Sequence, residues 1–112
     1  MQMGLGAVHT KASKWKYVPK PRSKEVGAEV DLVIDRADQC INLCEMKFYE
    51  EEFVVDREYA AKLRRKKECF ERVTGTGKPV FTTLITTQGA KHNDHYLAVV
   101  DQELTMDALF LR

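Results

Sequence analysis

The chain has 112 residues and a net charge of +1, and 44% of its residues are hydrophobic. This length and composition fit one folded domain and exclude a disordered protein. No apolar run approaches the ~20 residues of a membrane-spanning helix, and residues 1–6 do not resemble a secretory signal. Three cysteines without a signal sequence predict reduced thiols and a cytoplasmic location. Because bulk charge is near zero, nucleic-acid binding would require a local basic patch.

The first half of the chain is predicted to be β-rich. An alternation of lysine and aromatic residues around Trp15 predicts one short strand in an N-terminal segment, residues 1–27. Residues 28–112 are predicted to form the α/β core of the same single domain. Two β-prone runs, 30–34 and 41–48, flank a short polar stretch and predict a β-hairpin.

The second half is predicted to alternate helices and strands. Asp56 is expected to cap a helix over 57–73, and the β-branched run 80–87 predicts a buried strand. A last strand over 96–100 and a helix over 105–110, capped by Thr105, complete a mixed-sheet α/β fold. The apolar stripe expected on the first helix comprises Tyr59, Leu63 and Phe70, with Ala60 and Val73 on its flanks.

Three polar residues of the hairpin form the candidate site. Residues two apart in a strand share a face, so Glu45 and Lys47 point in the same direction. Asp31 on the preceding strand shares that face if the turn has three or five residues, which place it opposite Leu43 or Glu45. A four-residue turn would put it on the other face unless a bulge intervened.

These residue types in this arrangement favour metal-dependent phosphate chemistry. Mg²⁺ (or Mn²⁺) prefers hard oxygen ligands, which Asp31 and Glu45 would supply together with the Met46 carbonyl. Lys47 would orient the attacking water or stabilise the negative charge of the transition state. Without further evidence, an exposed sheet face with one ion pair explains the same residues equally well.

Asp31 followed by Glu45-Met46-Lys47 resembles the motif of the PD-(D/E)XK nuclease superfamily. The wider stretches 27–36 and 41–48, with 84–87 and 103–110, resemble the C-terminal domain of prokaryotic AAA-type ATPases, the archaeal-ATPase-like proteins. The resemblance covers most of residues 4–110. It implies a restriction-endonuclease-like fold, in which helices flank a mixed sheet. It also implies hydrolysis of DNA phosphodiesters that depends on a divalent metal.

Two departures from that family shape the functional expectations. No ATPase module precedes the domain, and the first core helix of the superfamily has no counterpart before Trp15. We therefore expect a fragment or a truncated gene product, with an AAA-type ATPase as partner in the parent protein. The alternatives are a non-catalytic regulatory or assembly module of that ATPase and a DNA-binding module without cleavage. A homodimer is a possible assembly.

The predicted helix also carries a basic run. Lys62 and Lys66 lie one turn apart and, with Tyr59, are candidate nucleic-acid contacts, although a solvated helix face explains them as well. Glu29 is an outer ligand or, more simply, a solvated charge, and Asp35 is a turn residue. The run comprises Lys62, Arg64, Arg65, Lys66 and Lys67.

Other suggestive patterns carry no site. The segment 75–78 contains two glycines and a lysine, but it lacks the first glycine and the final Ser or Thr of a phosphate loop. Cys40 and Cys44 would lie ~13 Å apart in one strand, too far to share zinc. His92 and His95 have no further spaced ligands and are read as surface residues.

Overall fold

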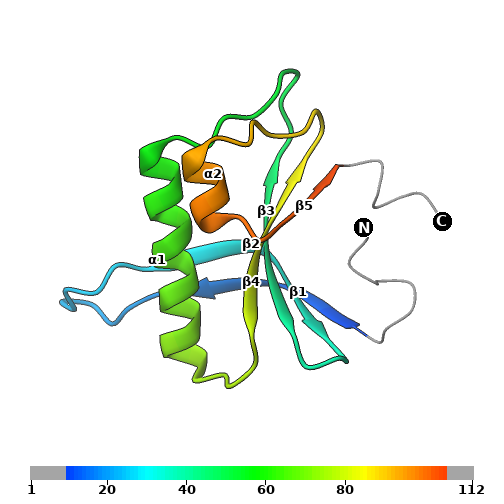
Figure 1. Ribbon diagram of the computed structural model, residues 1–112. Helices are drawn as coiled ribbons and strands as arrows, with labels where there is room; N and C mark the ends of the chain where they lie inside the picture. The colour runs from blue at the N-terminus through cyan, green and yellow to red at the C-terminus, as the bar shows by residue number, and fades with distance from the viewer. Residues whose placement is uncertain (1–9, 106–112) are drawn as a thin grey trace.

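The structure is a computed structural model that describes residues 10–105, which form one five-stranded mixed sheet and two helices (Figure 1). The strands follow one another across the sheet in chain order. The first three pair antiparallel, whereas the last two pairings are parallel. The predicted α/β class with a mixed sheet is therefore confirmed. The elements are β1 (Thr10–Tyr17), β2 (Ala28–Arg36), β3 (Ile41–Lys47), α1 (Arg57–Thr74), β4 (Val80–Thr86), α2 (Asp94–Val99) and β5 (Gln102–Thr105).

The predicted hairpin is formed by β2 and β3, which are joined by a three-residue turn, 37–39. The Arg36 N–H donates to the Cys40 carbonyl at 2.9 Å, and the last turn residue takes a left-handed φ of 69°. Three-residue hairpin loops commonly end on such a residue. The register therefore matches odd with odd positions, and Asp31 comes opposite Glu45 one step beyond the last paired residues.

Helix α1 begins and ends where capping residues stand in the sequence. The Asp56 carboxylate accepts the Tyr59 N–H at 2.8 Å, as an N-cap does. At the other end Gly75 adopts a left-handed φ of 63°, and its N–H donates to the Glu71 carbonyl. This C-cap extends the helix to Thr74, one residue beyond the prediction.

The buried face of α1 follows the predicted stripe with one exception. Ala60, Leu63 and Phe70 are buried, and the Trp15 ring of β1 packs edge-on against Phe70 at 5.1 Å between centroids. Val73 was expected on this face but is 39% exposed. It lies in the last turn of the helix.

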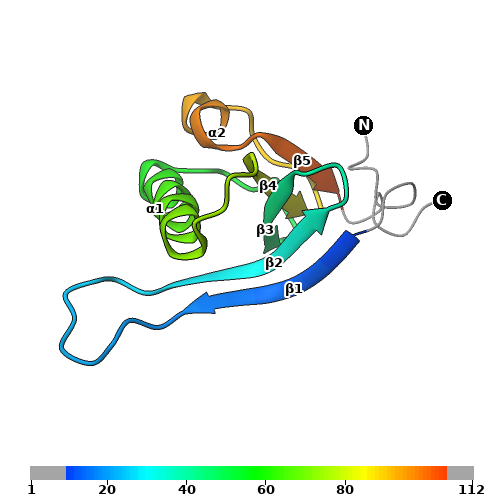
Figure 2. The same cartoon turned by 90° about the horizontal axis from the view of Figure 1, so that it is seen from below.

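Both helices lie on the same face of the sheet (Figure 2). Leu63 of α1, Tyr96 and Val99 of α2 and Leu84 of β4 belong to one buried cluster on this face. Neither helix is long and apolar enough to cross a membrane, within the residues that the structure describes. β2 lies between β1 and β3 in the sheet, and its N-terminal half, together with α1, lines the site described below.

The prediction for the C-terminal part is wrong in two places. Residues 96–100 were expected to form a strand, but 94–99 form α2, because the side-chain Oδ1 of Asn93 accepts the Tyr96 N–H at 2.8 Å and caps the helix. Tyr96 and Val99, three apart, then face the core together. Thr105 was expected to cap a helix but ends β5; residues 106–110 of that predicted helix lie outside the described residues.

Candidate metal and phosphate site

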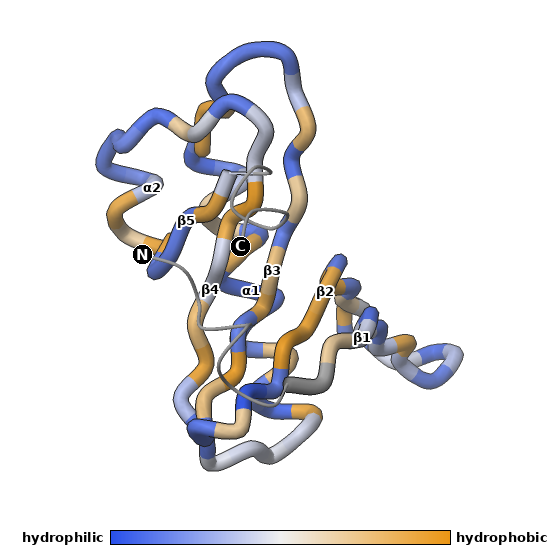
Figure 3. Tube along the Cα trace, turned by 90° about the vertical axis from the view of Figure 1, so that its right-hand side faces the viewer, coloured by the Kyte–Doolittle hydropathy of each residue, from blue (hydrophilic) through white to orange (hydrophobic). Residues whose placement is uncertain are grey.

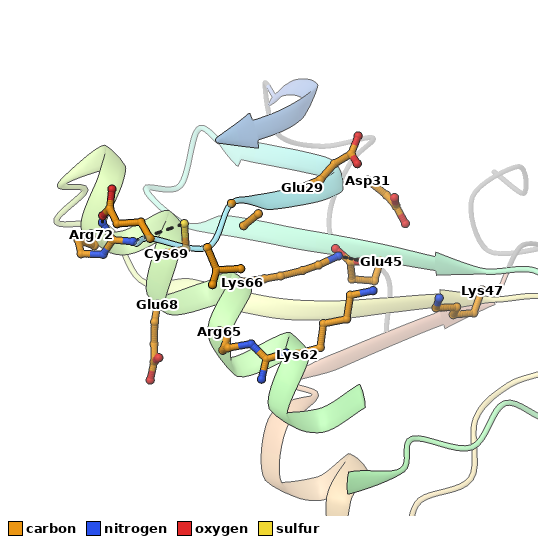
Figure 4. A pocket seen from close by; sticks show the side chains of 14 residues that line it. Glu29, Asp31, Glu45, Lys47, Lys62, Arg65, Lys66, Glu68, Cys69 and Arg72 are labelled. Carbon is orange, nitrogen blue, oxygen red and sulfur yellow. Dashed lines mark hydrogen bonds and ion pairs between the residues drawn. The ribbon is translucent and has the colours of Figure 1, made fainter. Parts of the chain in front are cut away.

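A groove of about 800 Å³ opens between α1, the N-terminal half of β2 and the end of β3 (Figure 4). The three hairpin residues singled out in the sequence, Asp31, Glu45 and Lys47, all line it, as do Lys62 and Lys66 of the basic run. The groove thus brings together acidic residues from the sheet and basic residues from the helix. Its other walls are Glu25, Val26, Gly27, Ala28, Glu29, Arg65, Glu68, Cys69 and Arg72.

A β-bulge in β2 shapes the part of the sheet that lines the groove. Between the pairs Ser13–Val33 and Trp15–Val30, β2 contains one residue more than β1. The bulge lets Val30 and Val33, three apart in the strand, both enter the core beneath α1. Bulges change the direction of neighbouring side chains, and Asp31 lies within this one. Sequence reasoning missed the bulge because it depends on pairing with β1.

The bulge fixes Asp31 against the neighbouring strand. Its Oδ2 accepts the Met46 N–H at 3.0 Å, although the residue itself is exposed. This bond holds the Asp31 side chain of β2 against β3, next to Glu45, as the shared face predicts. The structure also brings Met46 to this point through its N–H, and its carbonyl as a metal ligand stays a prediction.

Glu45 is the most unusual group in the groove, because it is a carboxylate that is only 4% exposed. Its Oε1 accepts from the Lys66 ammonium at 2.7 Å. Its Oε2 is buried and has no hydrogen-bond partner among the described residues. Burial raises the pKa of Glu45; the Lys66 pair opposes this rise, and the negative charge of Asp31 adds to it. One buried carboxylate oxygen therefore remains available beside a second carboxylate.

Lys47 is held by aromatic rings. Its ammonium lies 4.9 Å from the centre of the Tyr59 ring and 5.8 Å from that of Phe53. No ion pair joins it to an acidic side chain within residues 10–105. Burial raises the pKa of the Tyr59 phenol, whose hydroxyl is buried without a partner in the described chain. Tyr59, predicted as a nucleic-acid contact, lies beneath the Lys47 ammonium.

The basic run divides between the groove and the outer helix surface. Lys62 and Lys66 reach the groove as their spacing predicts, whereas Arg64 and Lys67 are not among its walls. Arg65 of the run and Arg72 beyond it also line the groove, and neither was predicted as a contact. The spacing of three to four residues along 62–72 is the helical signal that could have found them.

The remaining charged candidates lie outside the carboxylate pair. Glu29 pairs with Lys14 at 2.8 Å on an exposed part of β2. Asp35 near the hairpin turn pairs at 2.9 Å with Lys78, the lysine of the glycine-containing segment. Each of these two acidic residues therefore has an ion-pair partner within the chain and needs no bound ligand.

The other possible metal ligands do not gather. Cys40, Cys44 and Cys69 are free thiols, and His92 Nε2 lies 2.9 Å from a carboxylate oxygen of Glu103. Within residues 10–105, no three His, Cys, Asp or Glu side chains form a metal-binding group.

The donors in the groove fit a hard divalent cation. Mg²⁺ commonly takes one or two protein carboxylates and completes its shell with water and phosphate. Asp31 and Glu45 offer two carboxylates, and the buried Oε2 of Glu45 has no hydrogen-bond partner in the described chain. A cation at this point would satisfy that oxygen. Comparison of the chain with protein families, with curated proteins and with solved structures finds no match.

Proposed function

We propose that the groove is a divalent-metal phosphodiesterase site of the PD-(D/E)XK type that acts on DNA. The unpartnered buried Oε2 of Glu45, beside the carboxylate of Asp31, is the observation that carries the proposal. Leaving a buried carboxylate oxygen unsatisfied is unfavourable, and such exceptions need an explanation. A cation ligand explains it, because the oxygen then binds metal in the working state.

In this proposal Asp31 and Glu45 hold Mg²⁺ or Mn²⁺, and the Met46 carbonyl can add a third oxygen. The bound ion would lower the pKa of a water ligand and neutralise phosphate charge. Lys47 provides a positive charge that no acidic residue within residues 10–105 neutralises. It would orient the attacking water or stabilise charge on the phosphate. Lys62 and Arg65 on the helix wall would bind flanking phosphates.

Lys66 favours a second candidate, a non-catalytic module. Its ammonium already neutralises Glu45 at 2.7 Å, as a permanent lysine could where a metal is no longer used. The domain would then serve regulation or assembly, for example of the AAA-type ATPase that the resemblance implies. Self-association or ATPase binding that survives Glu45→Ala would support this candidate.

Metal-dependent nicking of supercoiled DNA separates the two candidates. The nuclease proposal predicts nicking with Mg²⁺ or Mn²⁺ that is lost in Lys47→Ala and kept in Lys91→Ala, a matched change of an exposed lysine outside the groove. Equal nicking by the wild type and Lys47→Ala would exclude the assigned role. No nicking by the wild type under any divalent metal would favour the non-catalytic module.

A further inference from the structure

The segment between β1 and β2, residues 18–27, stands out from the rest of the molecule as an arm (Figure 2). Figure 3 shows that its end is mostly hydrophilic. Residues 1–27 contain six lysine or arginine residues and one glutamate. Residues 28–112 contain twelve lysine or arginine residues and sixteen aspartate or glutamate residues. The two parts therefore carry net charges of +5 and −4, so the weak overall charge hides a strongly basic N-terminal region.

The only acidic residue of the arm is used to anchor its base. Glu25 pairs with Arg72 of α1 at 2.7 Å and accepts the Tyr17 hydroxyl at 2.7 Å. The base is also tightly packed, because a Cβ at Gly27 would meet the Tyr17 carbonyl oxygen at 2.8 Å. The arm is therefore fixed against the helix wall of the groove.

The basic residues of the arm remain without acidic partners. Lys20, Arg22 and Lys24 are exposed, and no ion pair joins them to an acidic residue in the described part of the chain. Since Glu25 is bonded to Arg72, no neighbouring carboxylate on the arm is left to neutralise them. The three charges are thus exposed to solvent within five residues of the chain.

The end of the arm keeps an arginine where glycine is favoured. The Ser23 N–H donates to the Lys20 carbonyl at 3.0 Å and closes a tight turn with Pro21 at its second position. Arg22 at the third position has a left-handed φ of 72°, which turns of this kind usually assign to Gly or Asn. The strained backbone therefore keeps an arginine in the turn of the arm.

We infer that the arm is a phosphate-backbone clamp that binds nucleic acid entering the groove. The arm lines the groove only at its base, residues 25–27; Lys20, Arg22 and Lys24 beyond it would form one basic surface, and Lys62 and Arg65 on the helix wall would form the other. Two basic surfaces with a gap between them fit a linear polyanion better than a flat membrane. Lys24 lies seven residues from Asp31, at most ~23 Å along an extended chain, so the arm would contact phosphates within about seven base pairs of the site.

This inference takes its nucleic-acid partner from the proposed function, but it is tested by binding without cleavage. The probe is a fluorescent DNA duplex of roughly 20 base pairs, about two helical turns, titrated in EDTA over about 50 to 200 mM salt. The arm variant combines Lys20→Gln, Arg22→Gln and Lys24→Gln. The control combines Arg57→Gln, Arg64→Gln and Lys91→Gln, exposed residues outside the groove with the same total charge change.

The arm variant should bind about tenfold or more weakly and lose roughly 2 to 3 from the slope of log K against log salt. The control variant should change that slope by less than about 1. Arg22→Gly should weaken binding while leaving thermal stability equal or higher, because glycine accepts the left-handed turn. Circular dichroism confirms that each variant is folded.

Three results would overturn the clamp: equal losses in both triple variants, no duplex binding by the wild type, or arm-dependent binding to phosphatidylserine vesicles with arm-independent binding to DNA. The nuclease proposal fails separately. Arm-dependent binding in EDTA without cleavage in Mg²⁺ would support the clamp and contradict the nuclease. Cleavage together with equal binding by both triple variants would support the nuclease and contradict the clamp.

Discussion

Two carboxylates of the sheet, Glu103 and Glu45, differ in the hydrogen-bond partners of their oxygens. Both oxygens of Glu103 in β5 have partners: Oε1 accepts the Tyr96 hydroxyl at 2.6 Å and lies 2.9 Å from His92, and Oε2 accepts the Ala90 N–H at 3.1 Å. Glu45 in β3 has one partner, Lys66, and one oxygen without any among the described residues. Glu103 therefore completes a structural network, whereas Glu45 is left ready for a ligand.

Removing the Lys66 partner should have the largest effect on this contrast. Lys66→Met would leave the buried Glu45 charge unpaired and should lower the free energy of unfolding by about 3 kcal/mol without metal. Mn²⁺ should restore part of the loss, because a ligand that binds only the folded state stabilises it. Urea denaturation with EDTA and with Mn²⁺ measures both effects. An unchanged midpoint in EDTA would mean that Glu45 does not need its partner.

Glu103→Gln tests the structural member of the pair. The amide oxygen can accept from only one side, so either the Ala90 N–H or the Tyr96 hydroxyl loses its acceptor, which should cost about 2 kcal/mol of stability. Mn²⁺ affinity should stay unchanged, since the groove does not include residue 103. Denaturation and metal titration of this single variant measure the two quantities. A marked loss of metal affinity would show that the two carboxylates are not independent.

The pH dependence of metal binding should come from Glu45. Its pKa is raised by burial, so the folded state holds the proton more tightly than the unfolded state. Stability from this group is present at low pH and is lost as pH rises through the raised pKa. Metal affinity runs the other way: below that pKa it should fall up to about tenfold per pH unit, or ~1.4 kcal/mol. Calorimetry across a pH series measures it, and a flat profile would contradict the role of Glu45.

The smallest expected change concerns the ring beneath Lys47. Tyr59→Phe keeps the aromatic face but removes a buried hydroxyl that has no partner among the described residues, so stability should rise by up to about 1 kcal/mol. Tyr59→Leu removes the ring and should lose about 0.5 to 1 kcal/mol of cation–π attraction. Thermal melts compare the two variants. If both lose equally, the ring does not support Lys47.

Local patterns predicted the parts of the molecule that depend on local structure. The polar turn and the alternation around Glu45 predicted the hairpin, and Asp56 and Gly75 marked the ends of α1. The run 96–100 was misread because a short apolar run fits a strand or a buried helix. Asn93 before it was the capping signal that could have corrected the prediction.

The sequence could not predict what depends on distant pairing. The bulge at Asp31 follows from the register of β2 against β1, and neighbouring residues do not determine that register. The contact of Lys66 with Glu45 joins residues twenty-one positions apart, so its partner could not be read from the helix alone. The groove therefore contains the three hairpin residues that the sequence singled out, while its charge balance became visible only in three dimensions.

The central claim is that Asp31 and Glu45 bind a divalent cation, and Mn²⁺ calorimetry on the domain tests it most directly. The variant is Asp31→Ala, and the matched control is Asp35→Ala, a carboxylate of the same strand that pairs with Lys78 outside the groove. The account predicts saturable binding by the wild type and the control that is lost in Asp31→Ala. Equal Mn²⁺ binding by all three proteins, or none by the wild type, would contradict it.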